Sequence, residues 1–176
     1  NSMKTWLLFA VLLVLPGLGA QSASCVVAPP GLVGWWKGDG DARDHFQGLD
    51  GTPQGGVSYQ PAIVGRGFQL DGLTGHIAIP DSPVLRPQSL TLEGWFNFSI
   101  VQPNQVLLGK TFGNTYSNSF ALWYYEGALR GFTWRHFSTT SSELVFPWIP
   151  IPGQWYHLAF TFDDATFEQA LYIDGL

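Results

Sequence analysis

The chain has 176 residues, of which 12% are charged and 15% are aromatic, and its formal net charge is −5. A chain of this length suits one domain with a single core. Its few Lys and Arg residues are dispersed, so there is no basic stripe to neutralise a phosphate backbone, and nucleic acid is not an expected partner.

The N-terminal segment has the features of a secretory signal peptide. Lys4 precedes the apolar run WLLFAVLLVLPGLGA, which is too short to span a bilayer comfortably and is interrupted by Pro16 before small residues. We therefore expect residues 1–24 to be a cleaved signal peptide, 25–30 a linker and 31–176 the folded domain. The protein would then be secreted or displayed at the cell surface, with no membrane span after cleavage. A retained anchor is the alternative.

Cys25 is the only cysteine of the chain. It follows the predicted signal closely enough for a lipidated cysteine, but Ser22 stands where a lipoprotein signal has leucine. The other interpretation is a thiol whose disulfide partner lies outside these 176 residues, as an odd cysteine in an oxidising compartment often indicates. Both roles stay open.

After residue 30 the chain alternates between short strand-like runs and turns rich in Gly, Pro, Asn and Asp. The runs are, in chain order, GLVGWW (31–36), GVSYQ (56–60), GFQL (67–70), HIAIP (76–80), SLTLEGWFNFS (89–99), QVLLGK (105–110), NSFALWYY (118–125), ALRGFTWRHF (128–137), SELVF (142–146), WYHLAFTF (155–162) and EQALYIDG (168–175). Because no helical pattern separates them, they predict an all-β fold, an antiparallel sandwich or barrel.

Side chains of successive residues in a strand point to opposite faces, which assigns each residue of the run 155–162 to a face. One face holds Tyr156, Leu158, Phe160 and Phe162, and the other holds Trp155, His157, Ala159 and Thr161. We expect His157 to pack or to form a hydrogen bond within the sheet, because a general base needs a nearby partner and the sequence identifies none.

Glu126-Gly127 predicts a two-residue hairpin that pairs Tyr125 with Ala128. In that register Leu129 shares a face with Phe120, Leu122 and Tyr124, whereas Phe132 and Trp134 do not. We expect a bulge at Gly131, which would return those two aromatics to the core face. The opposite face would then carry Trp123, Tyr125, Arg130 and Arg135.

Three longer motifs follow one another along the chain: GLVGWWKGDGDARD, GRGFQLDGLTGHIAIPDSPVLRPQSLTLEGWFNF, and GQWYHLAFTFD with LYIDG. With these motifs in this order, the chain from Gly31 onward resembles the laminin-G-like, concanavalin A-like modules of secreted bacterial proteins. The resemblance implies a two-sheet antiparallel jelly-roll sandwich that binds glycans or proteins, often with calcium. In the family further strands follow YIDG, so we expect this sequence to lack the last strands, leaving a sheet edge unpaired.

Two places are candidates for calcium. Asp39 and Asp41 begin like a calcium loop, but Arg43 occupies the next ligand position and Asp44 stands where the sharp turn needs Gly, so a solvated turn is expected. The resemblance implies another site, with Asn118 as one ligand and the remainder beyond Leu176. The metal ligands therefore stay unknown, and calcium is a possibility for a longer protein only.

The remaining acidic residues do not predict catalysis. Asp163, Asp164 and Glu168 flank a turn, where Asp is expected to bind backbone N–H groups. Glycosidases of this fold place two carboxylates at alternating positions of one strand, and Glu93 is the only acid in its run. No catalytic residue is assigned, and we expect no enzymatic activity.

Aromatic residues give the best indication of function, because Trp and Tyr rings stack on sugars while neighbouring polar groups bind hydroxyls. The candidate ligand-binding residues are Trp123, Tyr125, Arg130 and Arg135, with Tyr116 and Asn118 at the rim. The alternative for Trp123 is simple packing in the sandwich. The sequence thus favours a non-catalytic module that recognises a glycan or polysaccharide. A protein-binding adhesion or spacer module and a hydrolase of the same fold are the alternatives.

Overall fold

A computed structural model describes residues 28–110, 119–134 and 141–176. Residues Gly31–Leu176 form one compact unit, and only residues 28–30 of the other unit, Asn1–Pro30, are described. The predicted signal peptide and Cys25 lie outside the described residues, so the domain boundaries stay a prediction.

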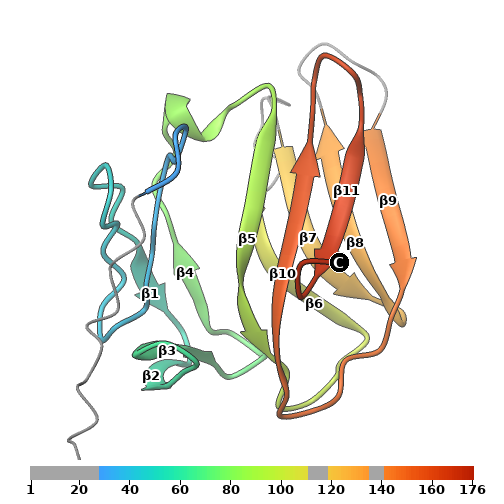
Figure 1. Ribbon diagram of the computed structural model, residues 1–176. Coiled ribbons are helices and arrows are strands. Elements are labelled where there is room, and N and C mark those ends of the chain that lie inside the picture. Colours follow the sequence, from blue (N-terminus) through green and yellow to red (C-terminus); the bar gives the residue numbers. More distant parts are fainter. Residues whose placement is uncertain (1–27, 111–118, 135–140) are drawn as a thin grey trace, which may run out of the picture. The chain divides into compact units, whose positions relative to one another are not determined.

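Eleven strands follow one another in the described part of the chain, which contains no α-helix (Figure 1). They are β1 (Thr52–Gln54), β2 (Val57–Pro61), β3 (Arg66–Leu70), β4 (His76–Ala78), β5 (Leu90–Asn97), β6 (Asn104–Lys110), β7 (Ser119–Tyr125), β8 (Ala128–Trp134), β9 (Ser141–Pro147), β10 (Trp155–Phe162) and β11 (Gln169–Ile173). A single 3-10 turn, η1 (Pro83–Leu85), precedes β5. Nothing in this part has the length and apolarity of a membrane-spanning helix. The predicted all-β fold is confirmed.

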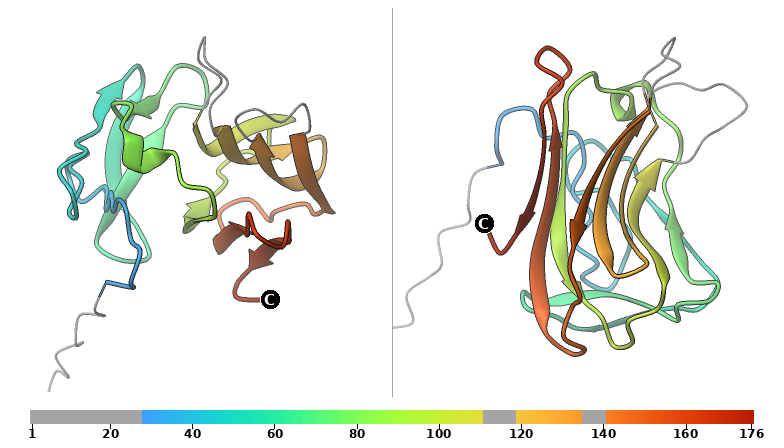
Figure 2. Two further views of the ribbon diagram at one scale, coloured as in Figure 1. Left: turned by 90° about the horizontal axis from the view of Figure 1, so that it is seen from above. Right: turned by 90° about the vertical axis from the view of Figure 1, so that its right-hand side faces the viewer.

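The strands pair antiparallel in two larger sheets and two ribbons. One sheet has the order β11-β10-β5, and the other has the order β6-β7-β8-β9. These two sheets lie face to face as the layers of a sandwich, with β11 against β8 and β9 (Figure 2). The ribbons β1-β4 and β2-β3 come from the N-terminal half of the unit. The antiparallel sandwich expected from the sequence is therefore present.

The predicted strand over 31–36 is wrong, since Trp36 there makes only an isolated bridge to Asp44. The backbone N–H of Trp35 donates instead to the Asp44 carboxylate, which makes this stretch part of a loop. The short strand β1 was not predicted, because its sequence, TPQ, shows no apolar alternation.

The core lies between the two larger sheets. Its buried residues are Phe98, Leu122, Tyr124, Leu129, Tyr156, Leu158, Phe160 and Phe162. Tyr156, Leu158, Phe160 and Phe162, which the sequence placed on one face of β10, all belong to this core, and Ala159 on the other face is buried as well. Burying each Leu or Phe side chain stabilises the fold by about 1.5 to 3 kcal/mol, so this aromatic layer holds the sheets together.

The predicted bulge at Gly131 is wrong. Pairing between β7 and β8 runs without a shift from Tyr125↔Ala128 to Ser119↔Trp134, and the irregularity lies in β6, between Val106 and Leu108. A Cβ on Gly131 would collide with the ring of Phe160 from the facing sheet. Glycine is needed at this position for close packing between the sheets, and the uninterrupted alternation places Phe132 and Trp134 on the outer face.

The acidic loop before β1 is organised by one buried carboxylate, that of Asp44, which is 8% exposed. Its two oxygens accept backbone N–H groups at 2.8 to 3.0 Å from Trp35, Phe46, Gln47 and Leu49. Burial would raise its pKa, but these hydrogen bonds outweigh burial and hold the pKa of Asp44 below its ordinary value of 3.8. The turn expected here is present, but Asp44 is buried in it rather than solvated.

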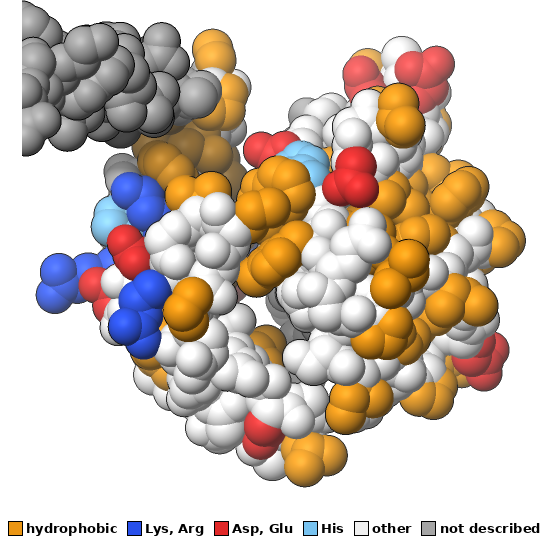
Figure 3. Space-filling view, turned by 60° about the horizontal axis from the view of Figure 1, so that its bottom comes forward, with side chains coloured by type: hydrophobic (Ala, Val, Ile, Leu, Met, Phe, Trp, Pro, Cys, Tyr) orange, Lys and Arg blue, Asp and Glu red, His pale blue; other side chains and the backbone are white. Residues whose placement is uncertain are grey.

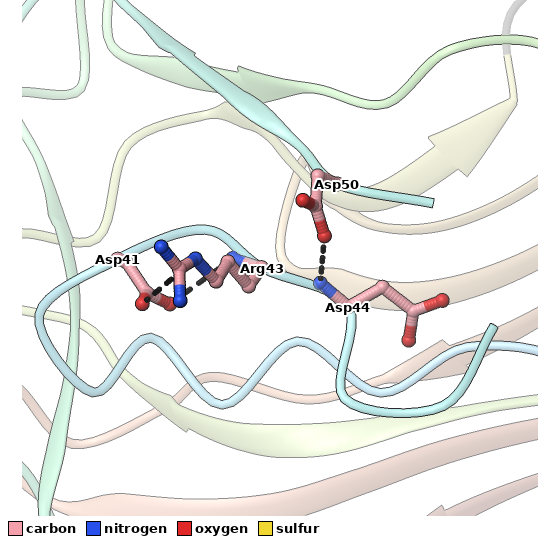
Figure 4. A network of polar contacts seen from close by, with 4 residues as sticks. All are labelled: Asp41, Arg43, Asp44 and Asp50. Carbon is pink, nitrogen blue, oxygen red and sulfur yellow. Dashed lines mark hydrogen bonds and ion pairs between the residues drawn. The ribbon is translucent and has the colours of Figure 1, made fainter. Parts of the chain in front are cut away.

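Two neighbouring acidic residues, Asp41 and Asp50, also accept backbone N–H groups of this loop (Figure 4). The Asp50 carboxylate accepts the backbone N–H of Asp44 at 3.0 Å. Asp41 accepts the backbone N–H of Arg43 at 3.1 Å and forms an ion pair with its guanidinium at 3.7 Å. The oxygens of Asp44 therefore face peptide donors, so they would have to give up these bonds to bind a cation.

Replacing Gly131 with Ala is expected to lower the free energy of unfolding by about 1 to 3 kcal/mol, because the added methyl group overpacks the core against Phe160. Urea unfolding measures the change. Gly109→Ala in β6 is the matched control, since a Cβ there meets neighbours only at 3.4 to 3.6 Å. Equal stability of both variants would contradict the proposed inter-sheet contact.

Asp44→Asn is expected to lower the free energy of unfolding at neutral pH by about 1 to 3 kcal/mol, because the amide nitrogen cannot accept two of the four N–H groups. The folded-state pKa is depressed, so the carboxylate stabilises the protein above its unfolded-state pKa, and this contribution is lost as pH falls through the folded-state pKa. Unfolding curves at several pH values should show the difference from wild type shrinking in acid.

The control for this experiment is Asp41→Asn, which removes an exposed carboxylate whose ion pair with Arg43 is worth less than about 1 kcal/mol. A pH-independent deficit in Asp44→Asn would mean that its effect does not arise from the ionised carboxylate.

Candidate functional site

The outer face of β7 and β8 brings together three of the residues that the sequence analysis selected. Trp123 and Tyr125 alternate outward along β7, and Arg130 on β8 is paired directly with Trp123. The hairpin that sets this register has positive φ at both Glu126 (48°) and Gly127 (77°), as a type I′ turn requires. We call Trp123, Tyr125 and Arg130 the aromatic platform.

The two rings of the platform lie nearly parallel. Their centroids are 5.7 Å apart and their planes differ by 19°. The guanidinium carbon of Arg130 lies 5.1 Å from the Tyr125 ring centroid, within the range of a cation–π contact. The platform is therefore a continuous aromatic surface with one cation beside it.

Arg130 is held in place by two further contacts. Its Nε donates to the backbone oxygen of Tyr125 at 3.4 Å, and its Nη1 lies 3.3 Å from Oε1 of Glu143 on β9. These contacts leave other guanidinium N–H groups to serve as donors, since the group carries five. Glu143 offsets the charge of Arg130, so the platform is suited to hydroxyl groups more than to a strong anion.

The hydroxyl of Tyr125 forms a hydrogen bond with Glu126, a residue of the hairpin turn. A hydrogen bond to the Glu126 carboxylate, together with the negative charge of that group, raises the pKa of Tyr125 above its ordinary value of 10.0. The phenol thus stays protonated, and its oxygen remains available as an acceptor.

Trp123 contains an unsatisfied donor. Among the described residues its indole Nε1 is buried and has no hydrogen-bond partner. Leaving a buried donor unpaired costs about 1 to 3 kcal/mol. Packing of Trp123, the alternative considered from the sequence, accounts for burial of the ring but not for this missing acceptor.

Three of the candidate residues, Arg135, Tyr116 and Asn118, lie outside the described residues, and their roles stay predictions. Sequence reasoning missed Glu143, Phe132 and Trp134 on this face, where Phe132 is paired with Glu143. Plain alternation along β8, without the expected bulge, would have found the two aromatics.

The other sheet carries His157 on its outer face. The imidazole packs edge-on against Trp95, with ring centroids 5.2 Å apart, as expected of a residue that packs within the sheet. Its Nε2 lies 3.7 Å from Oε2 of Glu93, a carboxylate neighbour that the sequence did not identify. This separation exceeds a hydrogen bond and permits an ion pair when the imidazole is protonated.

Asp163 at the β10–β11 turn binds backbone N–H groups, as expected. Oδ1 of Asp163 accepts the backbone N–H groups of Ala165 and Thr166 at 2.7 and 3.3 Å. In the described ranges no group of three or more His, Cys, Asp or Glu side chains is arranged to hold a metal ion.

The comparisons with known proteins agree with this fold. Residues 71–176 match the family model described as the concanavalin A-like lectin/glucanases superfamily, a superfamily that includes both lectins and glycosidases. Neither the curated proteins nor the solved structures gave a match. The matched segment spans more than half of the chain and contains both sheets of the sandwich, so the protein belongs to the laminin-G-like branch of the concanavalin A-like lectin/glucanases superfamily.

Proposed function

We propose that this domain is a non-catalytic module that recognises carbohydrate through the aromatic platform, as part of a secreted or cell-surface protein. One observation carries the proposal: two nearly parallel rings, Trp123 and Tyr125, lie beside a guanidinium on the outer face of a rigid sheet. Export rests on the predicted signal peptide.

The chemistry of the platform fits a sugar ring. The apolar face of a pyranose stacks on an aromatic ring, and its hydroxyls need donors and acceptors at the edge of that ring. Arg130 supplies donors, and the oxygen of Tyr125 is an acceptor. Because Glu143 offsets the charge of Arg130, we infer a neutral glycan.

Two other functions are weaker. Glycoside hydrolysis requires a pair of carboxylates, and Glu93, the acid in the relevant strand, has an imidazole as its close neighbour. A spacer module would need no aligned pair of rings, and a protein-binding module would need a wider contact surface than these three residues provide. Both functions remain distinguishable by experiment.

The test is titration of the protein with a panel of neutral polysaccharides, followed by affinity electrophoresis of variants. Trp123→Ala and Tyr125→Ala are each expected to weaken binding about tenfold, since one aromatic contact contributes about 1.4 kcal/mol. Trp35→Ala is the matched control, because Trp35 is another exposed indole, 46% accessible, that lies outside the platform.

Circular dichroism of each variant shows whether the fold is retained. Binding that persists in both platform variants, or that disappears equally in Trp35→Ala, would refute the proposal. Release of reducing sugar from the panel would show instead that the domain is a hydrolase.

A further inference from the structure

The loop that Asp44 organises has a second exposed indole, outside the aromatic platform, with basic residues around it. The two arms of the loop meet at the isolated antiparallel bridge between Trp36 and Asp44. Next to this bridge the backbone N–H of His45 donates to the backbone oxygen of Trp35 at 2.9 Å, so these two residues are paired as well. Directly opposed residues in an antiparallel pair project to the same side, about 5 Å apart. Trp35 and His45 therefore share one side of the loop.

Burial alternates along both arms and shows which side chains point outward. Trp36, Ala42 and Asp44 are buried or half-buried, whereas the residues on either side of Trp36 and of Asp44 are exposed. The pairing places Lys37 opposite Arg43, on the same side as Trp35. The exposed residues that share this side are Trp35, Lys37, Arg43 and His45, and we call them the basic face.

Lys37 gives this face a positive charge that no carboxylate offsets. Its Nζ lies 4.4 Å from the centroid of the Trp35 ring, in a cation–π contact. Among the described residues this ammonium group forms no ion pair. Arg43 has the Asp41 carboxylate at 3.7 Å, but that ion pair is exposed and weak, and the five N–H groups of a guanidinium leave donors for a ligand.

The surroundings of the basic face leave it in place and accessible. The Asp39 carboxylate, the other acidic group of the turn, lies beside Gly65, where an added Cβ would be 3.3 Å from Oδ1. Hydrogen bonds from backbone N–H groups to Asp44 hold the loop, and the side chains of the basic face take no part in them. In Figure 3 the Lys and Arg side chains in view gather on one side of the molecule, although the chain as a whole has a net charge of −5.

From this arrangement we propose that the basic face binds an acidic sugar, a uronic acid unit of a polysaccharide. The carboxylate of the sugar pairs with Lys37 and Arg43 through charge-assisted hydrogen bonds. Its ring lies against the indole of Trp35, which is 46% exposed and contacts the same ammonium group. The imidazole of His45 supplies a further N–H donor for a hydroxyl.

The small number of cations does not suit larger anionic partners. A phosphate backbone is neutralised by a series of Lys and Arg residues, and an anionic membrane surface attracts clusters of about four to eight. The basic face has Lys37 and Arg43 alone, and the indole beside them provides the apolar contact that a sugar ring uses. This site is independent of the platform, for which we propose a neutral glycan.

The experiment is calorimetric titration of the chain with trigalacturonate, with its methyl ester and with triglutamate. The ester keeps the sugar rings and removes the charge, so we expect it to bind at least tenfold more weakly. Lys37→Met is expected to weaken trigalacturonate binding about tenfold, which corresponds to about 1.4 kcal/mol, and Trp35→Ala to weaken it similarly, whereas Lys37→Arg retains it. The controls are Lys110→Met, which removes a cation of β6, and Trp123→Ala in the platform, and both should leave the affinity unchanged.

Absence of trigalacturonate binding, equal affinity for the ester, or full affinity in Lys37→Met would overturn the proposal. An equal loss in Lys110→Met would overturn it too, because the attraction would then come from the charge of the whole chain. Triglutamate that binds as tightly and is lost in the same variants would identify an acidic peptide as the occupant instead. Loss in Trp123→Ala with retention in Lys37→Met would assign the acidic sugar to the platform and refute the basic face. If the neutral glycans fail to bind while trigalacturonate succeeds, only the proposed function of the platform is lost.

Discussion

The contact between Phe160 and the backbone of Gly131 is the constraint on which the rest of the sandwich depends. The fully buried Phe160 ring occupies the space that a side chain at position 131 would need, so β8 and β10 approach closely at this point. Tight approach of two sheets fixes which side chains face inward on every neighbouring strand, because a slip of one residue would exchange the two faces. Both outer faces are therefore set by the core.

Strict alternation gives the two layers different chemistry outside the core. On β7 and β8 it directs Trp123, Tyr125 and Arg130 outward, and on β5 and β10 it directs Glu93, Trp95 and His157 outward. Both groups stand on paired strands rather than on loops, which keeps their geometry fixed before any ligand arrives. Preorganised sites lose less conformational entropy on binding, which favours the sugar recognition that we propose for the platform.

Sequence patterns within a few residues predicted the faces of single strands and the register of a hairpin, because short-range interactions determine both. The alternation in WYHLAFTF assigned each residue of β10 to its face, and Glu126-Gly127 set the β7–β8 register. The prediction of a bulge at Gly131 was wrong. Glycine is needed there because the Phe160 ring packs against it from the facing sheet, and no local sequence pattern reveals that contact. The prediction of a strand over 31–36 was wrong for a similar reason, because the backbone N–H of Trp35 donates to the carboxylate of Asp44, nine residues further along the chain. In the site, Glu93 and His157 meet only through strand pairing, so the sequence could not join them.

The indole N–H of Trp123 is buried and has no acceptor among the described residues, which makes it a distinct signal for nuclear magnetic resonance. In a spectrum of the ¹⁵N-labelled protein, this buried group would shift if a ligand stacked on the Trp123 ring, because its surroundings would change, while the exposed indole of Trp95 would respond to the opposite layer. The molecule thus contains two natural probes, one on each side of the sandwich.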